Sequence, residues 1–440
     1  MAQSYEEIML YLKSFKPKGM VLGLDRIRRL ASDLGNPQND YPSIIVGGTN
    51  GKGSTSAMIA SILKEAGFTA GLYTSPHLFD IRERIRISGK MVKKEDFCKA
   101  VSDVKRAGTD DITFFELLTV VAFLIFKRAN ADASVLEVGL GGRLDATIIT
   151  PSKTSVITNI GFDHVEILGN TLEKIAFEKA GIISDNSAVF TCERTPSAFK
   201  VIKDKCKNTG SRLFGYGKDF SASNISSARG GINFDFESEN FHIKNIHVPL
   251  EGEFQIYNAS IAIAATLDFA KNKRIISEDI LRKGLANVRW RGRMEHINIG
   301  REVLFDCAHN SHAARYLAGY LNKECLKREI VLVYGTVEEK DYRETLSMLA
   351  TKSRNIILTR PVNPRAKNPE SIKNELFRDE KNIEVEDDPL AALRLARQKC
   401  PKDGIICVTG SIFLVAPLIE YADKVLAHED KQQKKKIDII

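Results

Sequence analysis

The segment IIVGGTNGKGSTSAMIASIL, residues 44–63, constrains the fold of this chain more than any other part of its sequence. Its β-branched start predicts a buried strand, and its later apolar residues have helical spacing. Between them lies a glycine-rich turn that contains Lys52. A strand, such a turn and a helix form an anion cradle, because backbone N–H groups, the helix N-terminus and the lysine all favour phosphate oxygens. The segment therefore predicts an α/β domain that binds a nucleoside triphosphate.

The loop departs from the standard phosphate-binding pattern G-x-x-x-x-G-K-[ST]. Val46 occupies the first glycine position, and Gly53 separates Lys52 from the hydroxyl residue Ser54. A glycine-rich turn before an ordinary core helix is the alternative interpretation. Ser54 nevertheless stands where its hydroxyl would reach a magnesium ion beside the phosphates.

Length and composition are those of a globular protein with two or three domains: 440 residues, 43% hydrophobic and 27% charged. Acidic residues Glu6 and Glu7 argue against a secretory leader. The longest apolar run, residues 117–126, is too short to span a bilayer and predicts a buried helix. The seven cysteines form no C-x-x-C pair, which favours reduced thiols in the cytoplasm and no zinc site. We therefore expect no membrane partner.

The net charge of +8 raises the question of a nucleic-acid partner. Four of the lysines lie in the polar segment 431–440, which we interpret as a solvated tail. The remaining excess of positive charge would suit anionic small molecules equally well, and the sequence contains no RNA-binding motif. No nucleic-acid partner is expected.

Strands that alternate with helices predict a parallel sheet, with ligands at the carboxyl ends of the strands. Two N-terminal helices, interrupted at residues 17–19, precede the first strand. Alternation in residues 215–249 predicts a small antiparallel patch. Four further β-rich runs after residue 300 predict a second α/β domain. We expect a phosphate-loop, parallel-sheet ATPase domain at 1–295, a smaller Rossmann-like α/β domain at 296–430, and the tail.

Polar residues stand at the ends of several predicted strands of the first domain. Ser75 follows the second strand and precedes a densely charged loop with Arg82, Arg84 and Arg86. Glu137 interrupts an apolar strand, where a cation would offset the cost of burying its carboxylate. We favour a metal ion there, beside bound phosphate, over an arginine partner.

Other residues carry weaker signals. His164 follows a strand end beside Asp163, but a lone histidine is more often structural. Lys179 lies in an amphipathic helix, where an exposed lysine is the ordinary expectation. In the second domain, Asp306 and His309 follow a strand and precede a helix, which is the geometry of an anion site.

Eight motifs occur in a defined order along the chain: GTNGKGS, TSPHLFDIRERI, TFFE, LEVGLGGRLDAT, GFDH, FEKAG, RWRGRME and FDCAHN. In these motifs the chain resembles the folylpolyglutamate/dihydrofolate synthase family of the Mur-type ligase superfamily. The glycine inserted before Ser54 is part of that resemblance. The resemblance covers nearly the whole chain and is weakest between residues 200 and 252.

The resemblance implies roles for individual residues. It implies that ATP is bound by Asn50, Gly51, Lys52, Gly53, Ser54, Asn258, Arg293, Asp306 and His309. It implies that two magnesium ions are held by Ser54, Ser75, Glu137 and His164. Lys52, His164, Lys179 and Arg293 would serve catalysis, with Lys179 carbamylated and a potassium ion as a further cation. The pteroate or folate pocket would be formed by Thr113, Phe114, Phe115, Glu116, Leu144, Asp145 and Ala146, although the phenylalanines also suit a core.

The chemistry implied by the resemblance is amide formation in a monomeric enzyme. A folate or pteroate carboxylate attacks the γ-phosphoryl group of ATP, and the amine of L-glutamate then displaces phosphate from the acyl phosphate. Two other functions remain open at this point. A cell-wall Mur-type ligase normally has GKT or GKS in this loop, and a phosphate-loop ATPase with a macromolecular partner would hydrolyse ATP without a ligated product.

Overall fold

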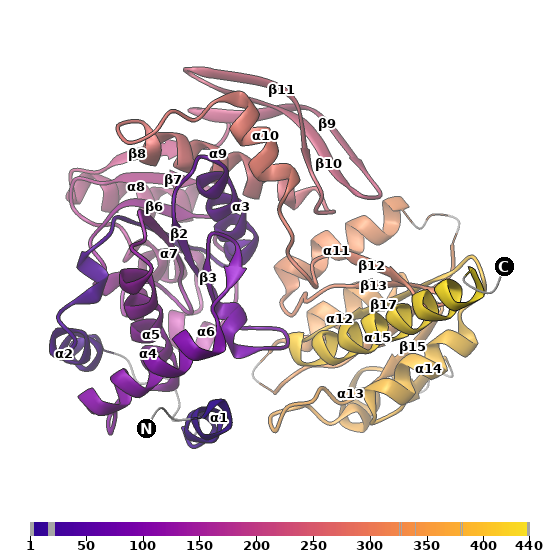
Figure 1. Ribbon diagram of the computed structural model, residues 1–440. Coiled ribbons are helices and arrows are strands. Elements are labelled where there is room, and N and C mark those ends of the chain that lie inside the picture. The colour runs from indigo at the N-terminus through magenta and orange to yellow at the C-terminus, as the bar shows by residue number, and fades with distance from the viewer. Residues whose placement is uncertain are drawn as a thin grey trace. The chain divides into compact units, whose positions relative to one another are not determined.

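The computed structural model describes residues 4–15, 23–324, 326, 328–338, 340–378, 380 and 382–437 (Figure 1). The chain divides into two compact units. Unit 1 consists of Met1–Gly161, Val165–Pro249 and Glu253–Arg289, and unit 2 of Phe162–His164, Leu250–Gly252 and Trp290–Ile440. The domain limits expected from the sequence, at residues 295 and 430, stay a prediction.

Unit 1 is built on an eight-stranded sheet in the order β4-β3-β2-β5-β1-β6-β7-β8. All neighbours from β2 to β8 run parallel, and β3 and β4 pair antiparallel at one edge. The parallel sheet confirms the expected fold class. The strands are β1 (Ser43–Gly47), β2 (Ala70–Tyr73), β3 (Ile85–Ile87), β4 (Lys90–Met91), β5 (Ala133–Glu137), β6 (Ser152–Ile157), β7 (Ala188–Thr191) and β8 (Arg212–Gly215).

Helices pack on this sheet in separate groups. Helix α3 packs against α9, α10, β2 and β5, whereas α5 packs against α2, α4 and β2. The α-helices of unit 1 are α1 (Tyr5–Lys13), α2 (Asp25–Asp33), α3 (Lys52–Glu65), α4 (Lys94–Ala107), α5 (Phe114–Arg128), α6 (Val165–Leu168), α7 (Leu172–Ala180), α8 (Pro196–Asn208), α9 (Phe254–Ala270) and α10 (Glu278–Ala286). Short 3-10 helices are η1 (Pro37–Asn39), η2 (Ile81–Arg84) and η3 (Ala146–Ile149).

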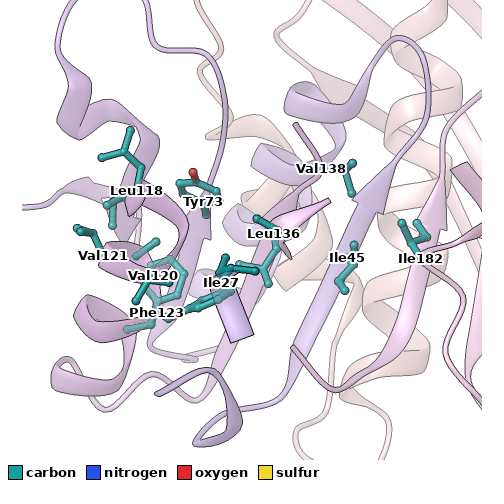
Figure 2. Packing of buried hydrophobic residues seen from close by; sticks show 14 of the residues in the cluster. Ile27, Ile45, Tyr73, Leu118, Val120, Val121, Phe123, Leu136, Val138 and Ile182 are labelled. Carbon is teal, nitrogen blue, oxygen red and sulfur yellow. The ribbon is translucent and has the colours of Figure 1, made fainter. Parts of the chain in front are cut away.

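The main hydrophobic core of unit 1 joins α5 to the sheet (Figure 2). Phe123 of α5 is fully buried, and Leu136 of β5 and Ile45 of β1 belong to the same cluster. Burial of one such side chain contributes about 1.5–3 kcal/mol to folding. The apolar run 117–126 is therefore a buried helix, as its sequence predicts.

A three-stranded antiparallel sheet follows, as the alternation in its sequence predicts. Its strands are β9 (Phe220–Ala228), β10 (Gly231–Ser238) and β11 (Phe241–Val248), in the order β11-β10-β9. Helix α9 packs against β9 and β10 on one side and β6 and β7 on the other, so it joins the small sheet to the large one.

Unit 2 contains a six-stranded sheet in the order β12-β13-β17-β14-β15-β16. Only the β12–β13 pair is antiparallel. The strands are β12 (Glu295–Asn298), β13 (Glu302–Phe305), β14 (Ile330–Tyr334), β15 (Asn355–Leu358), β16 (Ile383–Val385) and β17 (Ile405–Thr409). The helices are α11 (Ser311–Glu324), α12 (Tyr342–Ala350), α13 (Pro369–Leu376), α14 (Pro389–Lys399) and α15 (Ile412–Ile437).

The sequence predicts four of these six strands, and the two that it misses, β12 and β16, lie at the edges of the sheet. In unit 1 the expected charged loop after Ser75 instead contains η2 and the β3–β4 hairpin. The expected helix break at residues 17–19 lies outside the described residues. Helix α15 extends into the Lys-rich segment as far as Ile437. In the described part of the chain, no helix combines the length and hydropathy that crossing a membrane requires.

Candidate active site

The phosphate loop lies between β1 and α3, in the predicted strand–turn–helix arrangement. Thr158 and Asn159, which follow β6, hold the loop in shape. The Thr158 hydroxyl donates to the carbonyl of Asn50 at 2.6 Å, and the Asn159 amide exchanges hydrogen bonds of 3.0 and 3.1 Å with the Asn50 backbone. The loop is therefore preorganised by its neighbouring strand.

Two loop glycines have conformations that other residues rarely adopt. Gly48 has a φ of 131°, and a Cβ atom there would lie 1.9 Å from the Thr158 hydroxyl oxygen. Gly51 has a φ of 84°, and a Cβ atom there would lie 2.3 Å from the amide oxygen of Asn258. The structure thus brings Asn258 of α9 against the phosphate loop. The Asn258 amide is itself held by Gln255, whose side-chain oxygen accepts its N–H at 2.9 Å.

Two lysine side chains converge on the carbonyl of Gly48. Lys52 donates to that oxygen at 3.1 Å and to the Thr49 carbonyl at 2.9 Å, and Lys179 donates to it at 2.8 Å. Lys179 is only 4% exposed, so the expectation of an ordinary surface lysine is wrong. Helix α7 places its amine beside the phosphate loop, where positive charge favours bound anions.

Glu137 is buried, at 5% exposure, and accepts a hydrogen bond of 3.0 Å from the backbone N–H of Ser75. In the β1–β5 register Glu137 pairs with Val46, directly before the phosphate loop. Ser54 is also buried, in the first turn of α3. Oxygen groups of the kind that hard divalent cations prefer therefore lie on three adjacent segments of unit 1.

A pocket of about 1280 Å³ opens in unit 1. All seven residues expected to form the pteroate or folate pocket line it, from Thr113 to Glu116 and from Leu144 to Ala146. Further lining comes from helix α1, from Ser75 and His77, and from the glycine-rich turn 139–142. Concave sites with apolar walls and few polar groups are typical of small-molecule binding.

The TFFE motif shapes this pocket by starting α5. The Thr113 hydroxyl accepts the N–H of Glu116, and the Glu116 carboxylate accepts the N–H of Thr113 at 2.8 Å, which is a capping box. Glu116 also forms an ion pair with Arg26. Phe115 packs under Gly139, where a Cβ atom would lie 2.6 Å from its ring. Both polar residues of the motif therefore have structural partners.

Asp145 stabilises the glycine-rich turn 139–142 through hydrogen bonds to its backbone. Its buried carboxylate accepts hydrogen bonds from the backbone N–H groups of Gly139, Leu140 and Thr147, and from the Thr147 hydroxyl. Burial raises the pKa of Asp145, although these hydrogen bonds oppose the rise. The carboxylate thus fixes the wall of the pocket that it lines.

Arg84 and His77 are pocket residues to which the sequence alone gives no role. Arg84 is buried and donates through Nε to His77 Nδ1 at 2.9 Å. Burial, together with the charge of Arg84, lowers the pKa of His77 to about 4. The imidazole is therefore neutral at physiological pH, and its Nδ1 is an acceptor.

In unit 2, Asp306 follows β13 and is buried. Its carboxylate accepts the N–H groups of Met294 at 3.0 Å and Ala308 at 2.8 Å. Burial raises the pKa of Asp306, against the opposing charge of Arg293. The charge of Arg293 acts on Asp306, so the two side chains lie close together. The Nδ1–H of His309 donates to the carbonyl of Cys307 at 2.9 Å.

Asp163 is the centre of a second cluster in unit 2. Its carboxylate lies 2.6 Å from Lys340 Nζ, 3.2 Å from Asn310 Nδ2 and 3.4 Å from His309 Nε2. Burial alone would raise the pKa of Asp163, but the hydrogen bond with His309 and the charges of His309 and Lys340 hold it well below its usual range. Lys340 also lies 3.1 Å from Nε2 of His164, the residue predicted to bind metal. No motif in the sequence singles out Lys340.

Two family models match the chain along most of its length. The Mur ligase middle domain matches residues 46–266, and the Mur ligase, glutamate ligase domain matches residues 292–412. The dihydrofolate synthase/folylpolyglutamate synthase of Bacillus subtilis is 31% identical over 429 residues, which cover 95% of this chain and 99% of that protein. The chain belongs to the folylpolyglutamate/dihydrofolate synthase family of Mur-type ligases.

Solved structures of other members have the same fold. Escherichia coli FolC in complex with DHPP and ADP has a TM-score of 0.87 and 31% identity, and the match covers 96% of this chain and 98% of FolC. The Yersinia pestis bifunctional folylpolyglutamate synthase/dihydrofolate synthase, complexed with AMPPNP and a Mn ion, has a TM-score of 0.84 and 28% identity, with 96% and 98% covered. The family expected from the motifs is thus confirmed.

Proposed function

We propose that this protein is an ATP-dependent ligase that joins L-glutamate to the carboxylate of a folate or pteroate through an acyl phosphate. The observation that carries the proposal is the adjacency of two sites in unit 1. Glu137 faces Ser75 of the large pocket and pairs in register with Val46 of the phosphate-loop strand. A carboxylate held in that pocket meets the terminal phosphate of a nucleotide at this junction.

The chain's contribution is to neutralise charge and to orient the reactants. Lys52 and the N-terminus of α3 bind the phosphates, with Asn50, Gly51, Gly53 and Ser54 supplying backbone donors. The substrate carboxylate attacks the γ-phosphorus and ADP leaves. The glutamate amine then attacks the acyl carbon and phosphate leaves. Phosphoryl transfer of this kind depends mainly on positioning and electrostatic stabilisation.

Magnesium fits the residues at the junction, because the buried carboxylate of Glu137 lies beside Ser75 and next to the phosphate loop, where Ser54 begins α3. We propose that Ser54, Ser75, Glu137 and His164 hold two magnesium ions. The Mn ion of the Yersinia pestis relative supports a divalent cation. When bound, the cation neutralises phosphate charge.

We also propose roles for single residues that the family resemblance implies. Lys179, next to the phosphate loop, is carbamylated, and a potassium ion is an additional cation. Asn258, Arg293, Asp306 and His309 contact the nucleotide, while unit 2 serves the glutamate side. The enzyme acts as a monomer in the cytoplasm, which agrees with the free thiols of the six cysteines that the structure describes.

The test of this proposal is a ligation assay with ATP, magnesium and L-glutamate. Three parallel reactions contain 7,8-dihydropteroate, tetrahydrofolate or no pterin, and both ADP and product mass are measured. We expect ADP release that depends on a pterin, with a product heavier by one glutamate residue. Ligation of 7,8-dihydropteroate shows dihydrofolate synthase activity, and ligation of tetrahydrofolate shows folylpolyglutamate synthase activity.

ADP release without a pterin and without a ligated product would contradict the proposal. It would instead support the alternative of an ATPase coupled to a macromolecular partner. A cell-wall Mur-type ligase would ligate neither pterin, and would require a sugar-nucleotide substrate.

A further inference from the structure

A lysine of unit 2 contacts the histidine that the proposed function places at a metal ion. Lys340 Nζ lies 3.1 Å from His164 Nε2. An ammonium group has only donors, so the ring nitrogen is the acceptor of this hydrogen bond. The imidazole of His164 is therefore in the tautomer that carries its proton on Nδ1, and the lone pair of Nε2 points at Lys340.

Asp163 holds the lysine in this position. Lys340 Nζ donates to Asp163 Oδ1 at 2.6 Å, and the two side chains are only 13% and 11% exposed. The carboxylate is fixed in turn, because Asn310 Nδ2 donates to its Oδ2 at 3.2 Å and the backbone N–H of His164 donates to its Oδ1 at 3.0 Å. Lys340 is therefore directed at the imidazole by a largely buried ion pair, unlike a lysine on an open surface.

The backbone of His164 has a conformation that needs support from its surroundings. Its φ of 51° lies in the left-handed region, which residues other than glycine seldom adopt. Such conformations persist where neighbouring contacts impose them, and they are common at functional sites. Here the hydrogen bond to Asp163 fixes the backbone of His164, while the hydrogen bond from Lys340 fixes its ring. The Asp163–Lys340 pair thus determines where the imidazole points.

The contact with Lys340 and the binding of a metal ion make the same demand on Nε2. A histidine binds a metal ion through the lone pair of a ring nitrogen, and that lone pair is also what accepts a hydrogen bond. One lone pair cannot serve both partners, and an ammonium group and a divalent cation repel each other at such short range. Metal binding through Nε2 of His164 therefore requires Lys340 to leave the ring.

We propose that Lys340 is a positioning residue that competes with the metal ion for Nε2 of His164. It orients the imidazole before a metal ion binds, and the cost of breaking its hydrogen bond lowers the metal affinity of the site. The ion pair with Asp163 can persist after the exchange, since it does not involve Nε2. This inference rests on the proposed function, in which His164 holds a magnesium ion.

Titration with Mn²⁺ tests this inference without any turnover. The full-length protein is saturated with AMPPNP, and free Mn²⁺ is measured by its electron paramagnetic resonance signal. Lys340→Met should bind Mn²⁺ about 10- to 100-fold more tightly than the wild type, because a hydrogen bond from a charged donor no longer has to break. In a His164→Ala background, Lys340→Met should leave the Mn²⁺ affinity nearly unchanged, because the shared nitrogen is gone.

Lys367→Met is the matched control, because it removes the same charge from a neighbouring loop of unit 2. The backbone N–H of Lys367 donates to the Thr336 carbonyl, and its ammonium group lies 5.5 Å from the centre of the Tyr342 ring. Among the described contacts, none joins Lys367 to His164. This variant should keep the Mn²⁺ affinity of the wild type.

An unchanged or weaker Mn²⁺ affinity in Lys340→Met would overturn the inference. An equal gain in the His164→Ala background would overturn it too, since the lysine would then act only through its charge at a distance. If Lys340→Met does not fold, the wild type decides through the ¹⁵N resonances of its histidines. Saturating Mg²⁺ with AMPPNP should shift the Nε2 resonance of His164, and an unchanged resonance contradicts the exchange.

The two proposals fail separately. Glutamate ligation by the wild type, together with a Mn²⁺ affinity that does not depend on Lys340, refutes only this inference. The absence of both ligation and nucleotide-dependent Mn²⁺ binding refutes the proposed function as well.

Discussion

Lys52→Ala should lower the turnover number by about 10³-fold or more while the protein remains folded. Lys52 is the cation at the start of α3, and its amine already lies among the loop carbonyls of Gly48 and Thr49. Without it, the charge that develops on the transferred phosphoryl group loses its nearest protein partner. The measurement is steady-state ligation, with circular dichroism and thermal unfolding to establish that the fold is intact.

Lys64→Ala provides the control, because Lys64 lies on the same helix, is 45% exposed at its side chain and pairs with the adjacent Glu65. Its removal should change neither turnover nor the melting temperature appreciably, since exposed ion pairs contribute little. Normal ligation by a well-folded Lys52→Ala protein would refute the assignment of the phosphate loop.

Gly48→Ala should destabilise unit 1 by about 2–4 kcal/mol and abolish tight nucleotide binding. The new Cβ atom would lie 1.9 Å from the Thr158 hydroxyl and 3.0 Å from the Thr158 backbone nitrogen. Thr158 holds the Asn50 carbonyl, so its displacement would distort the loop as well as strain Gly48. Urea unfolding measures the free energy of unfolding, and titration with ADP measures the change in binding.

Gly35→Ala separates the clash from the backbone strain. Gly35 also has a positive φ, which is 74° against 131° for Gly48, and no atom lies within 4 Å of its added Cβ. This variant should cost only about 1–2 kcal/mol and leave ADP binding unchanged. Equal destabilisation by the two substitutions would mean that the contact with Thr158 is unimportant.

The parts of the fold that follow local patterns were predictable from the sequence. The β-branched residues 44–46 predict the buried strand β1. The glycines that follow predict a turn whose backbone N–H groups can bind phosphate. The same reasoning predicts α5 and the small antiparallel sheet. The edge strands β12 and β16 are partly exposed, so their sequences lack a continuous apolar signal.

The candidate site was predictable wherever a motif identifies it. All seven expected pocket residues line one cavity, and Ser75 contacts Glu137. The motifs do not reveal that Thr113 and Glu116 cap a helix, although the T-x-x-E spacing of a capping box was available as a signal. The burial of Lys179 depends on how α7 packs against the phosphate loop, which no local pattern encodes.

Arg84 illustrates the same limit more strongly. In the sequence it is one of several arginines in a charged segment, with nothing to distinguish it from Arg82 or Arg86. Tertiary structure makes the difference, because Arg84 at the end of η2 is buried in the pocket wall while Arg82 pairs with Asp80. Burial and the direction of a side chain are properties of packing, so they require the structure.

Ligation through an acyl phosphate can be tested with a pterin substrate whose reacting carboxylate carries ¹⁸O. The products of one reaction with ATP, magnesium and L-glutamate are analysed by mass spectrometry. We expect a glutamate-ligated pterin and inorganic phosphate that contains one ¹⁸O atom from the carboxylate. Unlabelled phosphate, or phosphate release with no ligated product, would contradict it.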